Sequence, residues 1–113
     1  MQSFFTDDEL KCKCCGTLRI DRDFRDKLNT ARFIAGFRFD VASGYRCPRH
    51  NEDIGSTSDN HTSGKAADIQ CNNDRQRHEM LIALIGVGML GLGLGKSFIH
   101  CDTNRTTAAV WTY

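Results

Sequence analysis

Residues 43–69 have the sequence SGYRCPRHNEDIGSTSDNHTSGKAADI, and this stretch decides which fold we expect. Its first part, residues 43–65, is rich in Gly, Ser, Asn and Asp, which predicts a long loop with room for one turn of helix. A strand is predicted directly after the loop, from Ala66 to Cys71. Because a loop of this length inside a compact domain usually carries function, we look for the site here.

The sequence before this stretch predicts two helices and a strand. Thr6 precedes two aspartates and is typical of a helix N-terminus, so residues 4–15 predict a short helix and a turn. From Asp21 to about Gly36, apolar residues fall every three or four positions, which indicates one buried helix face. Residues 37–42 alternate and are rich in Phe and Val, which predicts a strand.

The sequence after this stretch predicts one more helix and two strands. Asn73 is a good helix cap, and the apolar side of the helix that follows is predicted to hold Met80, Leu81, Leu84 and Ile85. We expect the segment GMLGLGLGKS, residues 88–97, to be a flexible connection because glycines alternate with leucines. Residues 97–103 and 108–113 predict the two final strands.

Together these elements predict the α+β class, with helices packed on a small antiparallel sheet. The 113 residues are expected to form a single domain spanning 1–113. A formal net charge of +1 gives no electrostatic footprint for nucleic acid or an acidic membrane. No apolar stretch reaches the roughly 18 residues of a membrane span, and the start lacks the features of a Sec signal.

Six cysteines are many for a chain of this length. We expect them to be reduced, buried thiols, with a structural metal or a disulfide to Cys47 as the alternatives. Cys12, Cys14 and Cys15 in KCKCCG resemble half of a zinc knuckle, but no second CxxC pair follows.

A candidate metal site combines loop and strand residues. His61 lies in the predicted loop, Asp68 lies in the predicted strand, and Gly64 lets the chain turn between them. His100 lies in the predicted strand SFIHCDT, where Asp102 projects from the same face. Two histidines and a carboxylate suit catalytic zinc, which keeps a fourth position open for water. The alternative is a histidine that caps a turn and a strand histidine satisfied by a carboxylate.

The quoted stretch resembles the core of the D-alanyl-D-alanine-type zinc peptidases. Those proteins carry an SGYR run, then a loop ending in HxxGxAxD, then a distal strand with a third histidine ligand. Residues 43–46 match the first motif and residues 61–68 match the second. FIHCDT, at residues 98–103, resembles the FVHVD form of small phage and bacterial members, as do the opening FFTDDELKCKCCG and the closing VWTY. The resemblance therefore covers nearly the whole chain.

This resemblance implies the hedgehog/D,D-peptidase fold and a catalytic Zn²⁺. It implies that the zinc ligands are His61, Asp68 and His100. Arg46 is implied to contact the substrate carbonyl or carboxylate, where a guanidinium stabilises a developing oxyanion.

The sequence departs from the family pattern in two places, a small one just before His61, where Asp59 and Asn60 follow Ser58, and one that bears on the mechanism. Several members place an acidic general base three residues before the last histidine, but that position here holds Ser97. Asp102 is the nearest acid on the same strand face. We expect it to be either the general base or a partner that orients a ligand histidine.

The resemblance predicts a zinc-dependent peptidase that hydrolyses peptide bonds in the stem peptides or cross-links of bacterial peptidoglycan. We expect a monomeric phage-type lytic enzyme, made in the cytoplasm without a Sec signal and acting at the bacterial cell wall after release or as part of a virion. One alternative is a catalytically silent zinc-binding structural or binding domain of a virion. Another is a zinc-ribbon adaptor centred on residues 12–15. The motifs leave open whether the bond cut is that of a D-Ala-D-Ala carboxypeptidase, an L-alanyl-D-glutamate endopeptidase or a cross-link endopeptidase.

Overall fold

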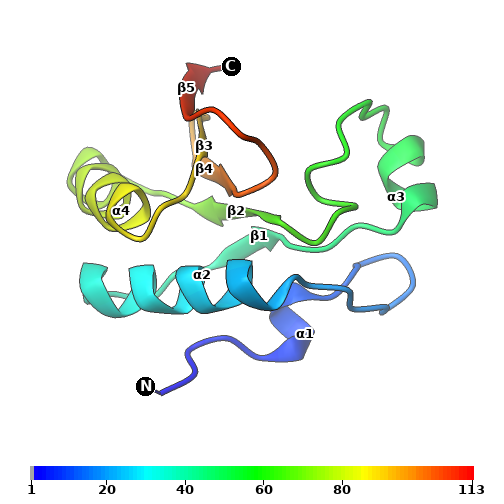
Figure 1. Cartoon of the computed structure of the whole chain (residues 1–113), viewed down its shortest axis with the longest axis horizontal. Coiled ribbons are helices and arrows are strands. Elements are labelled where there is room, and N and C mark those ends of the chain that lie inside the picture. Colours follow the sequence, from blue (N-terminus) through cyan, green and yellow to red (C-terminus); the bar gives the residue numbers. More distant parts are fainter. Residues whose placement is uncertain (1) are drawn as a thin grey trace.

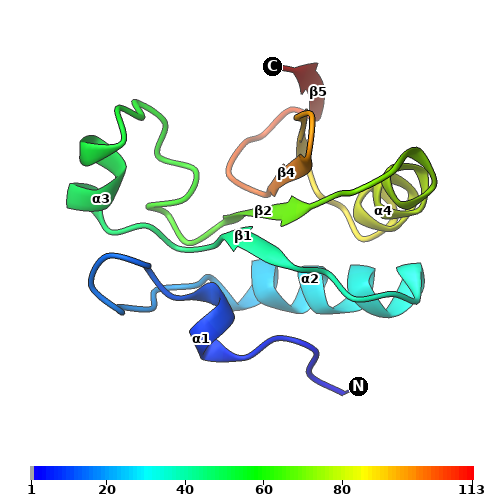
Figure 2. The ribbon, with the colours of Figure 1, turned by 180° about the vertical axis from the view of Figure 1, so that it is seen from behind.

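The computed structural model describes residues 2–113 and consists of short helices around one sheet. The elements follow in the order α1 (Asp7–Leu10), α2 (Arg22–Ala35), β1 (Val41–Ser43), α3 (Pro48–Asp53), β2 (Ala66–Gln70), α4 (Asp74–Gly86), β3 (Gly91–Leu94), β4 (Phe98–Asp102) and β5 (Ala109–Thr112). Helices α2 and α4 pack together, while α3 lies at the opposite end of the molecule from α4 (Figure 1). The view from behind gives the same arrangement (Figure 2). No helix among the described residues is long and apolar enough to cross a membrane.

The five strands form one sheet in the order β1-β2-β4-β3-β5. The predicted α+β class is confirmed, but the sheet is mixed because β5 pairs with β3 in parallel. The other three pairings are antiparallel. The predicted antiparallel pairing thus holds except at the edge formed by β5. The cause is the return of the chain after β4, which places β5 beside β3 instead of beside β4.

The helix ends follow the predicted caps. Thr6 accepts the backbone N–H of Glu9 and completes a capping box. The side chains of Asp21 and Asn73 cap α2 and α4. Gly36 ends α2 with a φ of 78°, in the left-handed region that favours glycine. The boundaries predicted for the two long helices are thus confirmed.

The segment predicted to be a flexible connection is instead strand β3. Leu92 points into the core and is almost fully buried. On the other face, a Cβ at Gly91 would meet the Asp102 carboxylate, and a Cβ at Gly93 would lie 2.7 Å from Trp111 Nε1. The glycines therefore make room for other side chains and do not make the segment flexible.

Two smaller predictions also differ from the structure. The strand predicted over residues 37–42 is shorter and lies at Val41–Ser43, where its pairing with β2 is irregular. In α4 the buried residues are Met80, Ala83 and Leu84, whereas Ile85 is 58% exposed. Ile85 lies one position beyond the buried stripe of the helix, which turns it away from the core.

Strand periodicity separates a core face from a site face. Ile99 and Cys101 of β4 are fully buried in the hydrophobic core, as the sequence predicts. His100 and Asp102 project from the opposite face of the same strand. The helix-covered face thus holds the core, and the other face is free to build a site.

Candidate metal centre

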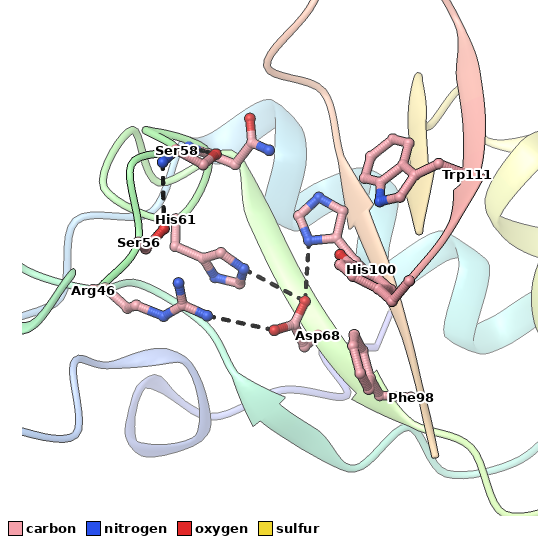
Figure 3. A pocket seen from close by; sticks show the side chains of 10 residues that line it. Arg46, Ser56, Ser58, His61, Asp68, Phe98, His100 and Trp111 are labelled. Carbon is pink, nitrogen blue, oxygen red and sulfur yellow. Dashed lines mark hydrogen bonds and ion pairs between the residues drawn. The ribbon is translucent and has the colours of Figure 1, made fainter. Parts of the chain in front are cut away.

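The structure brings His61, Asp68 and His100 together. Asp68 of β2 and His100 of β4 are direct partners in the antiparallel register, and His61 lies in the turns that lead into β2. Asp68 Oδ1 lies 3.0 Å from His100 Nδ1 and 3.4 Å from His61 Nε2. One ligand atom from each residue lies within 4.8 Å of the others. Figure 3 shows the two imidazoles converging on the carboxylate.

Backbone contacts fix the orientation of His61. Its Nδ1 lies 2.7 Å from the carbonyl oxygen of Gly44, so this nitrogen carries the proton and donates. Nε2 is then the nitrogen that faces Asp68. Gly64, with a φ of 74°, packs its Cα against the backbone of Arg19, where a side chain has no room. The turn that presents His61 is therefore held on both sides.

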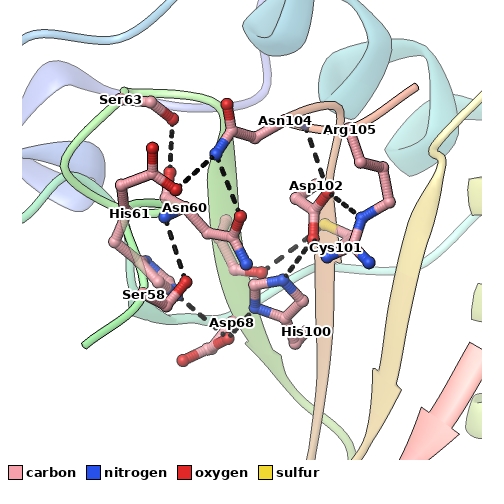
Figure 4. A network of polar contacts seen from close by, with 12 residues as sticks. Ser58, Asn60, His61, Ser63, Asp68, His100, Cys101, Asp102, Asn104 and Arg105 are labelled. Atoms are coloured by element: carbon pink, nitrogen blue, oxygen red, sulfur yellow. Dashed lines mark hydrogen bonds and ion pairs between the residues drawn. The ribbon is translucent and has the colours of Figure 1, made fainter. Parts of the chain in front are cut away.

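A buried carboxylate fixes the orientation of His100. His100 Nε2 lies 2.7 Å from Asp102 Oδ2, and Asp102 is fully buried. Arg105 donates to both oxygens of Asp102, at 2.9 and 2.7 Å. Figure 4 shows this chain of contacts from Arg105 through Asp102 to the imidazole. As a result, His100 Nδ1 is the nitrogen turned toward Asp68.

The protonation of these groups reflects their contacts. Burial raises the pKa of Asp68, but hydrogen bonds with His100 and His61 outweigh it and hold the pKa well below its usual range. Burial lowers the pKa of His100, but the Asp102 and Asp68 carboxylates raise it above its usual value. Burial likewise raises the pKa of Asp102, yet hydrogen bonds with His100 and Arg105 lower it to about 2. Both aspartates are therefore carboxylates at neutral pH.

Arg46 lies beside the two histidines and the carboxylate. Its Nη2 is 3.5 Å from Asp68 Oδ2, and its side chain is only 14% exposed. Nη1 donates to Asn51 Oδ1 and Nε donates to Ser43 Oγ. These contacts hold the guanidinium at the edge of the cavity.

A cavity of about 480 Å³ opens over the three predicted ligands. It is lined by Arg46, Ser56, Ser58, Asn60, His61, Asp68, Phe98, His100, Trp111 and Tyr113. The sequence predictions missed the aromatic wall, which combines Phe98 of β4 with two residues at the end of the chain. The only signal was the VWTY ending, whose resemblance to the family gave it no role.

Asp102 does not line this cavity, since it lies behind His100. Ser97, at the position where relatives carry an acid, is exposed and also lies outside the lining. Within residues 2–113, Asp68 is the only carboxylate that lines the cavity.

The residues present fit a zinc ion. Two imidazoles, each with its other nitrogen hydrogen-bonded, and one carboxylate are a typical ligand set for catalytic zinc. The carboxylate of Asp68 is in the form that binds metal. All three candidate ligands line the cavity, so a metal held by them would be open to it, as a catalytic site requires.

The sequence of this chain matches one family of known proteins. Residues 3–102 match the sequence model of a family described as peptidase M15. The comparison with curated proteins found no match. The family match contains the three ligands, Arg46 and Asp102. Because it covers most of the chain, this protein belongs to the peptidase M15 family of zinc-dependent metallopeptidases.

Proposed function

We propose that this chain is a zinc peptidase that hydrolyses peptide bonds in the stem peptides or cross-links of bacterial peptidoglycan. The observation that carries the proposal is the opening of the ligand set His61, Asp68 and His100 onto a cavity with a fixed guanidinium at its edge. A zinc ion held there supplies a Lewis acid that polarises the peptide carbonyl and makes water a nucleophile at neutral pH.

Arg46 is proposed to bind the oxygen atoms of the substrate. Its ion pair with Asp68 is long, at 3.5 Å, and its other donors meet neutral groups. The guanidinium can therefore turn part of its hydrogen-bonding capacity to a substrate carbonyl or terminal carboxylate. A donor placed at the site of reaction before the charge develops stabilises the transition state more than the ground state.

The cavity walls suit a short polar peptide. Ser56, Ser58 and Asn60 offer hydroxyl and amide groups along one wall, while Phe98 and Trp111 form an apolar wall. A stem peptide presents small alanine side chains, backbone amides and carboxylates. The apolar wall matches the methyl groups, and the polar wall together with the guanidinium matches the rest.

We assign Asp102 to positioning rather than to proton transfer. Its Oδ2 meets His100 Nε2, and Arg105 contacts both of its oxygens. It is fully buried and does not line the cavity, so a proton on the substrate side is out of its reach. Its role is to keep His100 Nδ1 aimed at the metal and to make that nitrogen a better ligand.

Digestion of purified peptidoglycan tests this function. The zinc-loaded chain should release fragments with new peptide termini, and mass spectrometry of the resulting muropeptides identifies the bond that is cut. The Asp68→Ala variant serves as the inactive control. Peptidoglycan left unchanged by a fully zinc-loaded chain would overturn the proposal.

One observation favours a second candidate, a catalytically silent zinc-binding domain. No described carboxylate other than the ligand Asp68 lines the cavity, and the usual position of the base holds Ser97. Such a domain would bind zinc and peptidoglycan peptides without turnover. Binding of a stem peptide to the zinc-loaded chain, with no product over long incubation, would favour this alternative.

The biological setting is also a proposal. The resemblance of FIHCDT and of both ends of the chain to small phage and bacterial members supports a monomeric lytic enzyme acting at the cell wall. The purified chain should elute as a monomer in size-exclusion chromatography. Added to permeabilised bacteria, it should reduce their turbidity, and the Asp68→Ala variant should not.

A further inference from the structure

A second group of metal-ligating side chains lies outside the cavity. The sulfur atoms of Cys12, Cys14, Cys15 and Cys47 all lie within 4.8 Å of one another. The prediction of buried thiols is wrong for this group, because only Cys12 is buried and both Cys14 and Cys15 are exposed. Hydrophobic packing does not explain why one buried thiol gathers with two exposed ones and the partly buried Cys47.

The distances fit a metal site with four sulfur ligands. In a tetrahedral site with Zn–S bonds of about 2.3 Å, neighbouring sulfurs lie about 3.8 Å apart. Cys14 Sγ and Cys47 Sγ are separated by 3.5 Å. That separation is close to the tetrahedral edge and far longer than a disulfide bond of about 2.05 Å.

The backbone around the cysteines is arranged as a tight turn. Cys12 N–H donates to Thr17 O, and Gly16 N–H donates back to Cys12 O, each at 2.8 Å. Gly16 has a φ of 73°, which lets the chain reverse directly after the two adjacent cysteines. The turn therefore presents three thiols within the four residues 12–15.

Two sulfur atoms also accept backbone hydrogen bonds. Cys47 N–H lies 3.3 Å from Cys12 Sγ, and His50 N–H lies 3.4 Å from Cys47 Sγ at the start of α3. Such bonds stabilise thiolates and are the kind of outer contact that orients metal ligands.

We propose that Cys12, Cys14, Cys15 and Cys47 bind a second zinc ion that has a structural role. The four ligands complete a tetrahedron, so no position is open for water or substrate, in contrast to the cavity site. The ion would join the turn after α1 to the N-terminus of α3, where Cys14 and Cys47 are 33 positions apart in the chain. Because Cys47 directly follows Arg46, the metal would also anchor the backbone of the substrate-binding arginine.

Metal counting in a variant that lacks the cavity site tests this proposal. His61→Ala removes one cavity ligand, so after purification under reducing conditions it should keep about one zinc per chain. Reconstituted with Co²⁺ instead, it should show the near-ultraviolet charge-transfer band that thiolate ligands give and that imidazole and carboxylate ligands do not. Adding Cys14→Ser to His61→Ala should abolish both signals. Cys14 is exposed, so this change leaves the core intact.

The matched control replaces a thiol outside the group. Cys71 is buried near the C-terminal end of β2, so His61→Ala with Cys71→Ser should keep the zinc and the cobalt band. The proposal is overturned if reduced His61→Ala binds neither zinc nor cobalt, or if the metal present is iron. It is also overturned if Cys14→Ser leaves the zinc in place. None of these readouts uses hydrolysis, so failure here is distinguishable from failure of the proposed function.

Discussion

The group of two histidines and an aspartate at the cavity and the group of four cysteines outside it differ in how the fold holds them. The ligands His61, Asp68 and His100 stand on or beside central strands, and both imidazoles are fixed by hydrogen bonds to Gly44 and Asp102. The four thiols stand on a turn and at a helix start, and two of them are exposed. One group faces a cavity, and the other offers a complete set of ligands.

The number of ligands, and how rigidly the fold holds them, distinguish a catalytic metal site from a structural one. Three ligands held rigidly, with a fourth side open, suit chemistry at the metal. Four ligands on loops suit a metal that holds those loops in place, because the free energy of metal binding then stabilises the folded state. Replacing one side chain at a time, and measuring zinc content and hydrolysis separately, tests whether the two groups have different roles.

The largest effect is expected from Asp68→Ala. Asp68 contacts both ligand histidines and Arg46, so its loss removes a ligand and the charge that organises the other groups. Hydrolysis of peptidoglycan should fall to background, while about one zinc per chain remains on the cysteines. Asp53→Ala, which changes an exposed carboxylate on α3, is the control and should keep both activity and zinc. Substantial activity in Asp68→Ala would contradict the assignment of the cavity as the site.

The next effect concerns Arg46. Arg46→Ala should lower kcat/KM by about 10²- to 10³-fold, the size expected for losing one oxyanion donor. Zinc content should not change, because Arg46 is not a ligand. Arg49→Ala is matched in charge and lies on exposed α3, so its kcat/KM should equal that of the parent chain. Equal activity in the two variants would make Arg46 purely structural.

A smaller effect is expected from Asp102→Asn. An amide keeps the shape but weakens the support of His100, so zinc affinity at the cavity should fall by about 10- to 100-fold. Excess zinc should then restore most of the rate. If Asp102 were the general base, the variant would keep its zinc and lose on the order of 10²- to 10⁴-fold in rate, which added zinc could not restore. Zinc titration of the activity therefore separates the two roles.

The smallest effect on hydrolysis is expected from Cys14→Ser. The thiol group lies outside the cavity, so kcat/KM should change by less than about tenfold, which corresponds to about 1.4 kcal/mol in the barrier. Part of that change should appear in KM, because Arg46 is anchored through its neighbour Cys47. The melting temperature should fall, since a ligand bound only by the folded state is lost. Loss of all activity would mean that hydrolysis at the cavity requires the cysteine group.

Local signals were enough to predict much of the fold. The two long helices could be predicted because caps such as Asp21 and Asn73 and the apolar spacing lie within the segment itself. Strand β3 could not, because its glycines are required by Asp102 and Trp111, which come later in the chain. The parallel pairing of β5 depends in the same way on where the chain returns, which no local pattern encodes.

For the candidate site, too, local sequence patterns predicted some features and missed those that depend on distant residues. Motif resemblance pointed to the residues that the structure gathers at the candidate centre, and strand periodicity placed His100 and Asp102 on one face. Periodicity did not reveal that Asp102 lies behind His100, because the direction depends on Arg105 and on the space above Gly91. The convergence of Cys47 on the cysteine turn was equally hidden, since it joins segments separated by a helix and a strand.

Because of the position of β5, the cavity wall formed by Trp111 and Tyr113 can be varied by substitution. β5 is the edge strand at the end of the chain, it pairs with β3 alone, and it supplies no metal ligand. The family match stops at residue 102, before Trp111 and Tyr113. A library randomised at these two positions would therefore vary one wall of the cavity while keeping His61, Asp68 and His100 in the chain, so β5 and the residue after it are the part to vary when peptide preference is redesigned.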